Sequence, residues 1–300
     1  IPMLVLLADE SARVKFFALN FLAAQKVPDF AAQIVEILEQ NNNRDPFLRI
    51  ACAHALASTL TEQQFVALQA LPNAAARLGV VVALRRIKSA LLENYVVDAD
   101  PRVADEAIRA IHDQMLEGSR PAVASLLDQR DGVTHTEMMW RRLLHSAFRL
   151  GGDENASRLL AAASDAHLPD AVREEAVRLL STWTKPFPVD QSIGRWAPLA
   201  ERDPAPLKKI LTAGLPALLK SGGPALVSGL GLVEQYQLKL EGLAGGLIPG
   251  PPVPGKGGPE GPTAAAAASP PTEGSDEPVP GLKVNVCMRA SGVQRNPESK

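Results

Sequence analysis

The sequence has 300 residues, of which 46% are hydrophobic and only 4% aromatic, so Ala, Leu and Val supply most of the apolar mass. That composition is sufficient for a sizeable core and favours helix over strand. The formal net charge of −2 disfavours nonspecific binding to nucleic acid or to anionic membranes, and two cysteines are too few for a disulfide framework or a four-cysteine zinc site. The chain shows no signal peptide and no apolar run of the roughly 18 residues that cross a bilayer.

From residue 1 to about residue 245 the chain predicts repeated helix pairs. The first helices begin near an Asp or Asn and carry an arginine about one turn later, with Ala104 and Leu207 in place of the arginine in two copies. The corresponding positions are 13, 49, 77, 104, 142, 173 and 207. Their spacing of 27 to 38 residues indicates helical repeats with loops of variable length, and it excludes a coiled-coil heptad.

Helix-start and helix-stop signals support these pairs. An Asp-Pro pair opens the first helices at Asp45, Asp100 and Asp203. Asp accepts hydrogen bonds from the free backbone N–H groups of the first turn, and proline has no backbone N–H that would need a partner there. Thr61 to Gln64 forms a predicted capping box, and Gly151 ends a helix over 136–150. The second helices are predicted over 28–40, 61–70, 89–96, 121–128, 153–164 and 224–243.

These patterns predict an all-α fold, an α-solenoid of HEAT-like helix pairs over residues 1–245. Each pair buries its apolar face only by stacking on its neighbours. The recurring Asp and Arg near the first-helix starts predict a ladder of ion pairs between repeats, with solvated arginines as the alternative. Because the N-terminal segment Ile1 to Leu7 has no polar face, we expect exposed apolar surface at that end, covered by upstream residues or by a partner.

The composition changes near residue 248. Pro and Gly occupy 17 of the 34 positions from Pro249 to Leu282. Short Ala-rich and polar stretches lie between and after them. Such a segment buries too little apolar surface to offset its ordering entropy. We therefore expect residues 246–300 to form a second, low-complexity and mostly disordered Pro/Gly/Ala-rich tail.

Four blocks in the middle of the chain resemble the HEAT region of the large PVC-type membrane-bound dehydrogenases, which join a β-propeller, HEAT repeats and a c-type cytochrome domain. The blocks are Arg85–Ser89, Asp98–Asp113, Phe148–Ala156 and Trp183–Asp203, in that order. The resemblance implies a protein or neighbouring domain as partner and a periplasmic or cell-envelope location. The residues of these blocks that we take as interaction or family-signature candidates are Asp100, Arg109, His112, Asp113, Trp183, Arg195 and Trp196.

The haem site that the resemblance implies departs from the family pattern. Covalent c-type haem needs Cys-x-x-Cys-His, but after Cys287 the positions of the second cysteine and the histidine hold Ala290 and Ser291. Propeller residues are also absent from the sequence. We therefore expect no haem or other cofactor, no metal site and no catalytic residue in this chain.

The remaining candidate residues favour structural roles. No two of the five histidines are spaced for joint metal binding on a helix, and no Gly-x-Ser-x-Gly elbow is present. We interpret His112 as a residue at a helix C-terminus rather than as half of a catalytic pair with Asp113, because adjacent helical residues point apart. Trp183 and Trp196 flank a Pro-rich loop. One interpretation is that both tryptophans anchor this loop on the core, and the alternative is that they form a docking point for another domain.

Two classes of function remain. The first is a non-catalytic scaffold that binds a protein or packs neighbouring domains together, with the chain as a fragment of a multidomain dehydrogenase. The second is a HEAT-like enzyme of the lyase type with an acid–base residue in the concave face. The second requires a pocket that holds a buried carboxylate or histidine of shifted pKa.

Overall fold

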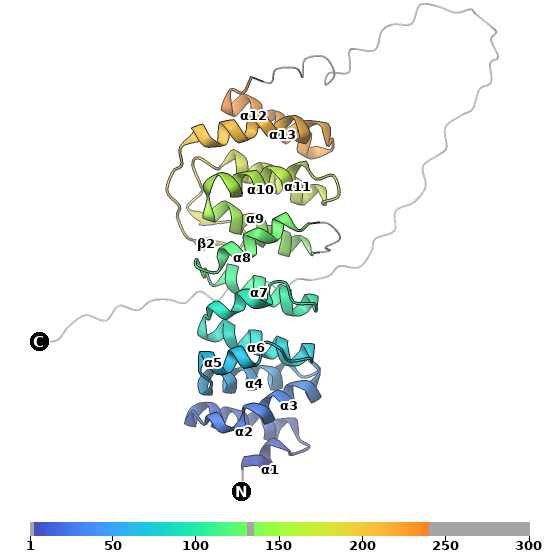
Figure 1. Cartoon of the computed structure of the whole chain (residues 1–300), viewed down its shortest axis with the longest axis vertical. Helices are drawn as coiled ribbons and strands as arrows, with labels where there is room; N and C mark the ends of the chain where they lie inside the picture. Colours follow the sequence, from blue (N-terminus) through green and yellow to red (C-terminus); the bar gives the residue numbers. More distant parts are fainter. Residues whose placement is uncertain (1–2, 131–134, 240–300) are drawn as a thin grey trace, which may run out of the picture. The chain divides into compact units, whose positions relative to one another are not determined.

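The computed structural model describes residues 3–130 and 135–239. The chain divides into two units, Ile1–Ile248 and Pro249–Lys300, and the described residues all belong to the first. The tail predicted over 246–300 therefore lies outside the described residues. The described part is mostly helical, as the composition predicts, and its only strands form one short antiparallel pair (Figure 1).

A first layer of helices runs through this unit, because each of its helices contacts the next one along the chain (Figure 1). These helices are α2 (Ala12–Gln25), α4 (Pro46–Thr59), α6 (Ala74–Ile87), α7 (Pro101–Asp113), α9 (Glu137–Leu150), α11 (Asp170–Ser181) and α13 (Pro224–Tyr236).

A second set of helical segments packs against the first layer. Its members are α3 (Ala31–Asn41), the 3-10 helix η2 (Ala90–Tyr95), α8 (Arg120–Ala124) with the 3-10 helix η3 (Ser125–Asp128), α10 (Gly152–Ser164) and α12 (Pro204–Lys220). Three shorter elements are α1 (Met3–Leu7), the 3-10 helix η1 (Pro28–Phe30) and α5 (Glu62–Ala67). The pairing of a first-layer helix with a second-layer partner agrees with the predicted order of elements up to α11, except that the second helix predicted over 61–70 is only the short α5, outside this second set.

The predicted caps are confirmed at most helix starts. The Asp45 carboxylate accepts hydrogen bonds from two backbone N–H groups of α4, and Asp100 accepts one from α7. Thr61 and Gln64 form both bonds of the capping box. Each cap contributes about 1 kcal/mol, so the start of each helix is fixed locally. The caps explain why the sequence locates helix starts well.

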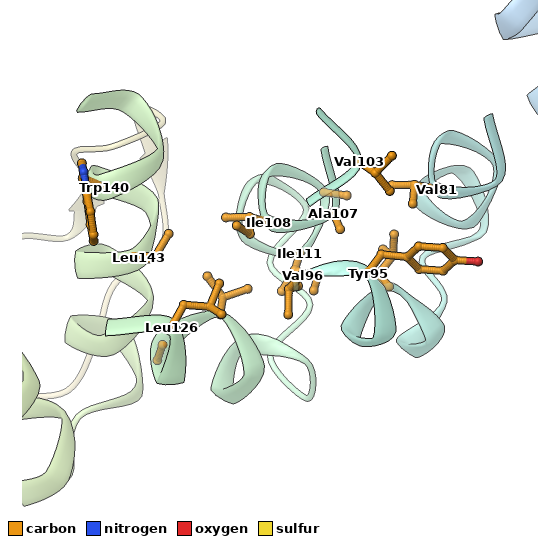
Figure 2. Close-up of a cluster of buried hydrophobic side chains, with 14 of the residues drawn as sticks. Val81, Tyr95, Val96, Val103, Ala107, Ile108, Ile111, Leu126, Trp140 and Leu143 are labelled. Carbon is orange, nitrogen blue, oxygen red and sulfur yellow. The ribbon is translucent and has the colours of Figure 1, made fainter. Parts of the chain in front are cut away.

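Alanine and branched side chains fill the core between the layers. Figure 2 shows the part of the core around α7, with side chains from α6, η2, η3 and α9. Ile108 and Ile111 of α7 are fully buried, and the side chains of Trp140 and Leu143 of α9 are at most 2% exposed. Ala107 is also fully buried, and its small side chain allows α7 to lie close to its neighbour.

The expected ladder of ion pairs is confirmed in part. Arg77 of α6 forms two 2.8 Å hydrogen bonds with Asp98, just before α7, and Arg142 of α9 forms two 2.9 Å bonds with Asp113 at the end of α7. The acceptors are not the capping aspartates that the pattern suggested, because a capping carboxylate is already occupied by its own helix. Asp100 binds its own neighbour Arg102 instead.

The C-terminal end corrects one prediction. We expected Asp203 to open a first helix and 224–243 to contain its second helix. Instead α12 packs against α10 of the second set, and α13 packs against α11 of the first layer. The Asp-Pro cap at Asp203 marks a helix start correctly, but a cap carries no information on which layer the helix joins. Helix α13 ends at Tyr236 and residues 237–239 are not helical, so the helix predicted over 224–243 is too long; residues 240–243 lie outside the described residues.

Replacing Ile108 by alanine is expected to lower the free energy of unfolding by about 2–5 kcal/mol, because the cavity forms where α7 meets its neighbours. The matched control is Val97→Ala, which removes an exposed side chain just before α7 and should change stability by less than about 0.5 kcal/mol. Urea unfolding followed by circular dichroism measures both. Equal effects of the two changes would contradict the described packing of α7.

Candidate interaction site

The segment between α11 and α12, residues 182–203, is called the long loop here. It contains the only strands of the described chain, β1 (Val189–Asp190) and β2 (Arg195–Trp196), which pair antiparallel. The turn between them closes through a 2.8 Å bond from Gly194 N–H to the Asp190 carbonyl. Gly194 has φ +67°, a backbone conformation that glycine adopts without strain. In Figure 1, β2 is drawn at the level of α8 and α9.

A buried carboxylate fixes this hairpin. The side chain of Asp190 is 1% exposed, and its Oδ1 accepts bonds from the Ser192 backbone N–H at 3.0 Å and from the Ser192 hydroxyl at 2.5 Å. Its Oδ2 lies 3.5 Å from the guanidinium of Arg149 on α9. Burial raises the pKa of Asp190, but the bonds from Ser192 together with the nearby His112 and His145 lower it overall, so the group is ionised at neutral pH.

His112, at the end of α7, joins the loop to the helices. The side chain is fully buried; its Nε2 lies 2.7 Å from the Ser192 hydroxyl and its Nδ1 lies 2.9 Å from the Ser146 hydroxyl. Arg120 Nη1 is 3.3 Å from Nδ1. Arginine can only donate, so Nδ1 accepts and Nε2 carries the proton. His112 therefore donates to Ser192, and Ser192 donates to Asp190.

Burial and then the nearby Arg120 lower the pKa of His112 to about 3, although the charge of Asp190 acts in the opposite direction. The imidazole is therefore neutral at physiological pH. A neutral ring suits this position, because it can accept on one nitrogen and donate on the other. The prediction that His112 is structural agrees with this geometry, but its main contact is with the long loop.

A second cluster holds the loop against α11. His145 of α9 lies 2.7 Å from the carboxylate of Glu175, and Arg178 donates to the same carboxylate at 2.6 and 2.7 Å. Burial raises the pKa of Glu175, yet the bonds from His145 and Arg178 lower it to about 2. Arg178 also binds the side chain of Gln191, so this cluster reaches the hairpin directly.

The two ends of the long loop meet in an aromatic clamp. The guanidinium of Arg202 stacks 4.9 Å from the ring of Phe148 and 4.4 Å from the ring of Trp183. It also donates to the Phe148 carbonyl at 2.6 Å and the Trp183 carbonyl at 3.3 Å. Burial and then Arg149 lower the pKa of Arg202 to about 10, so it stays cationic at neutral pH. The clamp closes the loop without a disulfide or a metal.

The two tryptophans of the loop have different roles. Trp183 is 4% exposed and anchors the loop, whereas Trp196 is 70% exposed. Arg195 and Phe187 are exposed as well. The interpretation that both tryptophans anchor the loop is therefore wrong for Trp196. The loop presents an aromatic ring and a guanidinium to solvent, and these are side chains that protein interfaces favour.

The other predicted site residues lie elsewhere on α7. Asp100 caps the first turn of α7, about 18 Å along the helix from His112 at 1.5 Å per residue. Arg109 forms an ion pair with Glu106, and Asp113 binds Arg142. The structure thus brings His112, Trp183, Arg195 and Trp196 to the long loop, and it leaves Asp100, Arg109 and Asp113 in helix caps and ion pairs.

Sequence reasoning missed five residues of this site. They are His145, Arg149, Glu175, Asp190 and Ser192. His145 and Glu175 are 30 residues apart in the sequence, and His112 and Ser192 are 80 residues apart. No short sequence motif can therefore contain both partners of either bond. The Asp-x-Ser spacing of Asp190 and Ser192 does indicate a local turn, because an aspartate carboxylate readily accepts from the backbone two residues on. It does not indicate that the turn is buried.

The chemistry of the site does not suit nucleophilic catalysis. Ser192, His112 and Asp190 have the composition of a serine triad, but His112 donates to Ser192 instead of accepting its proton. The adjacent cavity, which Asp190, His145 and Arg149 line together with other polar and apolar side chains, measures about 20 Å³, which is room for about one water molecule. Within residues 3–130 and 135–239 no three His, Cys, Asp or Glu residues gather to hold a metal ion.

No protein-family model matches the chain, and no curated protein matches it with significance. Among the helices that the structure describes, none combines the length and apolar composition needed to cross a bilayer.

Acidification is expected to destabilise the folded chain through His112. The pKa of this side chain is about 3 in the folded chain, against 6.5 for a histidine exposed to water, so between these values the unfolded chain binds a proton that the folded chain does not. Stability therefore falls as the pH drops below 6.5, by up to about 2 kcal/mol at pH 5. Urea unfolding at pH 7.5 and pH 5 measures this loss, and His112→Gln should show a smaller one. The hypothesis fails if both proteins lose the same stability.

Removing the carboxylate of Asp190 is expected to release the long loop. Asp190→Ala leaves Arg149 with an uncompensated buried charge, so we expect a loss of about 3–5 kcal/mol and faster amide exchange over residues 187–199. Glu174→Ala, which removes an exposed carboxylate of α11, is the matched control and should leave both quantities unchanged. Unchanged exchange of the loop in Asp190→Ala would show that this carboxylate does not hold it.

Proposed function

We propose that this chain is a non-catalytic helical-repeat scaffold of the HEAT type that binds a protein or a neighbouring domain through the long loop. The α-solenoid assignment is supported by the neighbour-to-neighbour contacts of the first layer and by the recurring Asp caps. Such stacks are stabilised mainly by contacts between adjacent repeats, and they commonly serve as extended binding surfaces.

The exposed side chain of Trp196 carries the proposal. Large aromatic rings are costly to leave in water, and hot spots of protein interfaces are enriched in tryptophan and arginine. Trp196 lies next to Arg195 on a hairpin whose other side is fixed by Asp190 and Ser192. A fixed hairpin loses little conformational entropy when it binds. Less of the interaction energy is therefore offset by ordering, and the affinity is higher.

The resemblance to the PVC-type dehydrogenases suggests which partner to test first. By that resemblance the partner is the β-propeller or the cytochrome c domain of the same protein, at the cell envelope. The described residues do not fit covalent haem attachment, because their one thiol is Cys52, which is buried within α4 and free. Burial raises the pKa of this thiol to about 12. Because Ala290 and Ser291 follow Cys287 in place of the second cysteine and the histidine of the haem motif, we assign any haem in such an assembly to another domain.

The acid–base enzyme has less support. The buried Asp190 and the buried His145 line a cavity, as that alternative requires, and His112 lies beside Asp190. However, the environment lowers the pKa of His112 to about 3 and lowers the pKa of Asp190, whereas an efficient general acid or base has a pKa near the working pH. The cavity of about 20 Å³ is also far below the volume of a substrate pocket.

The proposal is tested at Trp196. A photo-crosslinking amino acid is placed at position 196, or at the equally exposed Val227 of α13 as a control, and the chain is expressed in its own host. We expect one protein or domain to cross-link at position 196 and not at 227. That partner is then purified, and its Kd for the chain is measured directly.

In the reconstituted complex, Trp196→Ala should raise the Kd about 30-fold, which corresponds to the loss of one interface hot spot. Val227→Ala should leave the Kd unchanged. Both side chains are largely exposed, so neither change should lower the melting temperature. A Trp196→Ala complex with the original affinity would reject the long loop as the docking element.

A further inference from the structure

A cluster of exposed apolar side chains lies far from the long loop in the sequence. Phe17 and Phe21 of α2 and Phe47 and Ile50 of α4 are called the aromatic patch here; all four are about half or more exposed. Residues spaced by three or four share one face of a helix, so each pair lies on one face of its helix, and Phe17 and Phe47 line the same groove. Contiguous apolar surface of this kind marks an interaction site.

The patch is hollowed where α2 and α4 begin. A groove of about 450 Å³ lies there, lined by Phe16, Phe17, Phe47 and Leu48. Phe47 is 71% exposed, and Phe16 packs edge-to-face on Phe17. The surface thus combines a projecting aromatic ring with a concave apolar receptor of suitable size.

Opposite charges flank this groove. Arg13 of α2 and Asp45 at the start of α4 both line it. Arg13 forms no ion pair with any residue of the described ranges, and Asp45 uses Oδ1 to cap its own helix. Two copies related by a two-fold axis can therefore place the cation of each copy against the anion of the other.

We propose that a second copy of this chain docks on the aromatic patch across a two-fold axis. In such a symmetric interface each contact occurs twice, so Phe47 enters the groove of the other copy. Arg13 meets Asp45 of the partner subunit, and the reverse contact closes the pair. The dimer leaves the long loop free, so it is independent of the proposed docking at Trp196.

Sedimentation equilibrium of the full 300-residue chain tests the dimer. We expect a reversible monomer–dimer equilibrium that Phe47→Glu weakens by at least about tenfold, because a carboxylate replaces the ring that enters the groove. Val227→Glu, which changes an equally exposed apolar side chain on α13, should have no effect. Unchanged melting temperatures confirm that both variants fold.

The charge pair tests the register of the two copies. Arg13→Glu places like charges together twice, so we expect the dimer to weaken by about tenfold at low salt. Adding Asp45→Asn removes the repulsion and keeps the helix cap, so the double variant should regain part of the affinity. A chain that stays monomeric at all concentrations, or a dimer insensitive to Phe47→Glu, overturns the proposal. Failure of the double variant to regain affinity rejects this two-fold arrangement.

Discussion

The buried carboxylate of Asp190 is the interaction on which the arrangement of the long loop depends. An ionised carboxylate inside a protein costs several kcal/mol unless it is paired and hydrogen-bonded. Here Ser192 supplies two bonds to one oxygen, and Arg149 compensates the charge at the other. The Asp190 carboxylate therefore holds the loop in place, because few other arrangements of the loop would keep this buried charge paired and hydrogen-bonded. The same network surrounds the fully buried His112, and that burial keeps the imidazole neutral against the opposing charge of Asp190.

The network also adds bonds between helices of the first layer beyond their direct packing. In a stack of repeats each helix contacts its neighbours, so stability is roughly a sum of neighbouring interfaces. The long loop adds bonds to α7 through His112, to α9 through Arg149 and to α11 through Arg178. Three consecutive first-layer helices are thereby joined by one segment of chain. We infer that these repeats unfold as a more cooperative unit than the repeats before α7.

The two proposed interaction surfaces arise from different physical causes. Trp196 is exposed because a polar network fixes the backbone on either side of it and leaves its ring no place in the core. The aromatic patch is exposed because helical periodicity directs Phe17 and Phe47 away from the layer interface. The exposed apolar surface expected at the N-terminal end is found at Leu4 and Phe17, whereas Leu7 is buried. The first surface is specified by tertiary contacts, and the second by local pattern alone.

The sequence by itself determined the elements of the fold. Caps such as Asp45 and Thr61 act within four residues, and apolar spacing within a helix is equally local, so both can be recognised without coordinates. The tertiary structure alone decided which layer α12 joins and which carboxylate each arginine binds. It also decided that Trp183 is buried while Trp196 is exposed. The reason is that the contacts of Asp190, His112 and Glu175 bring together chain segments up to 80 residues apart, and no local pattern encodes such a distance.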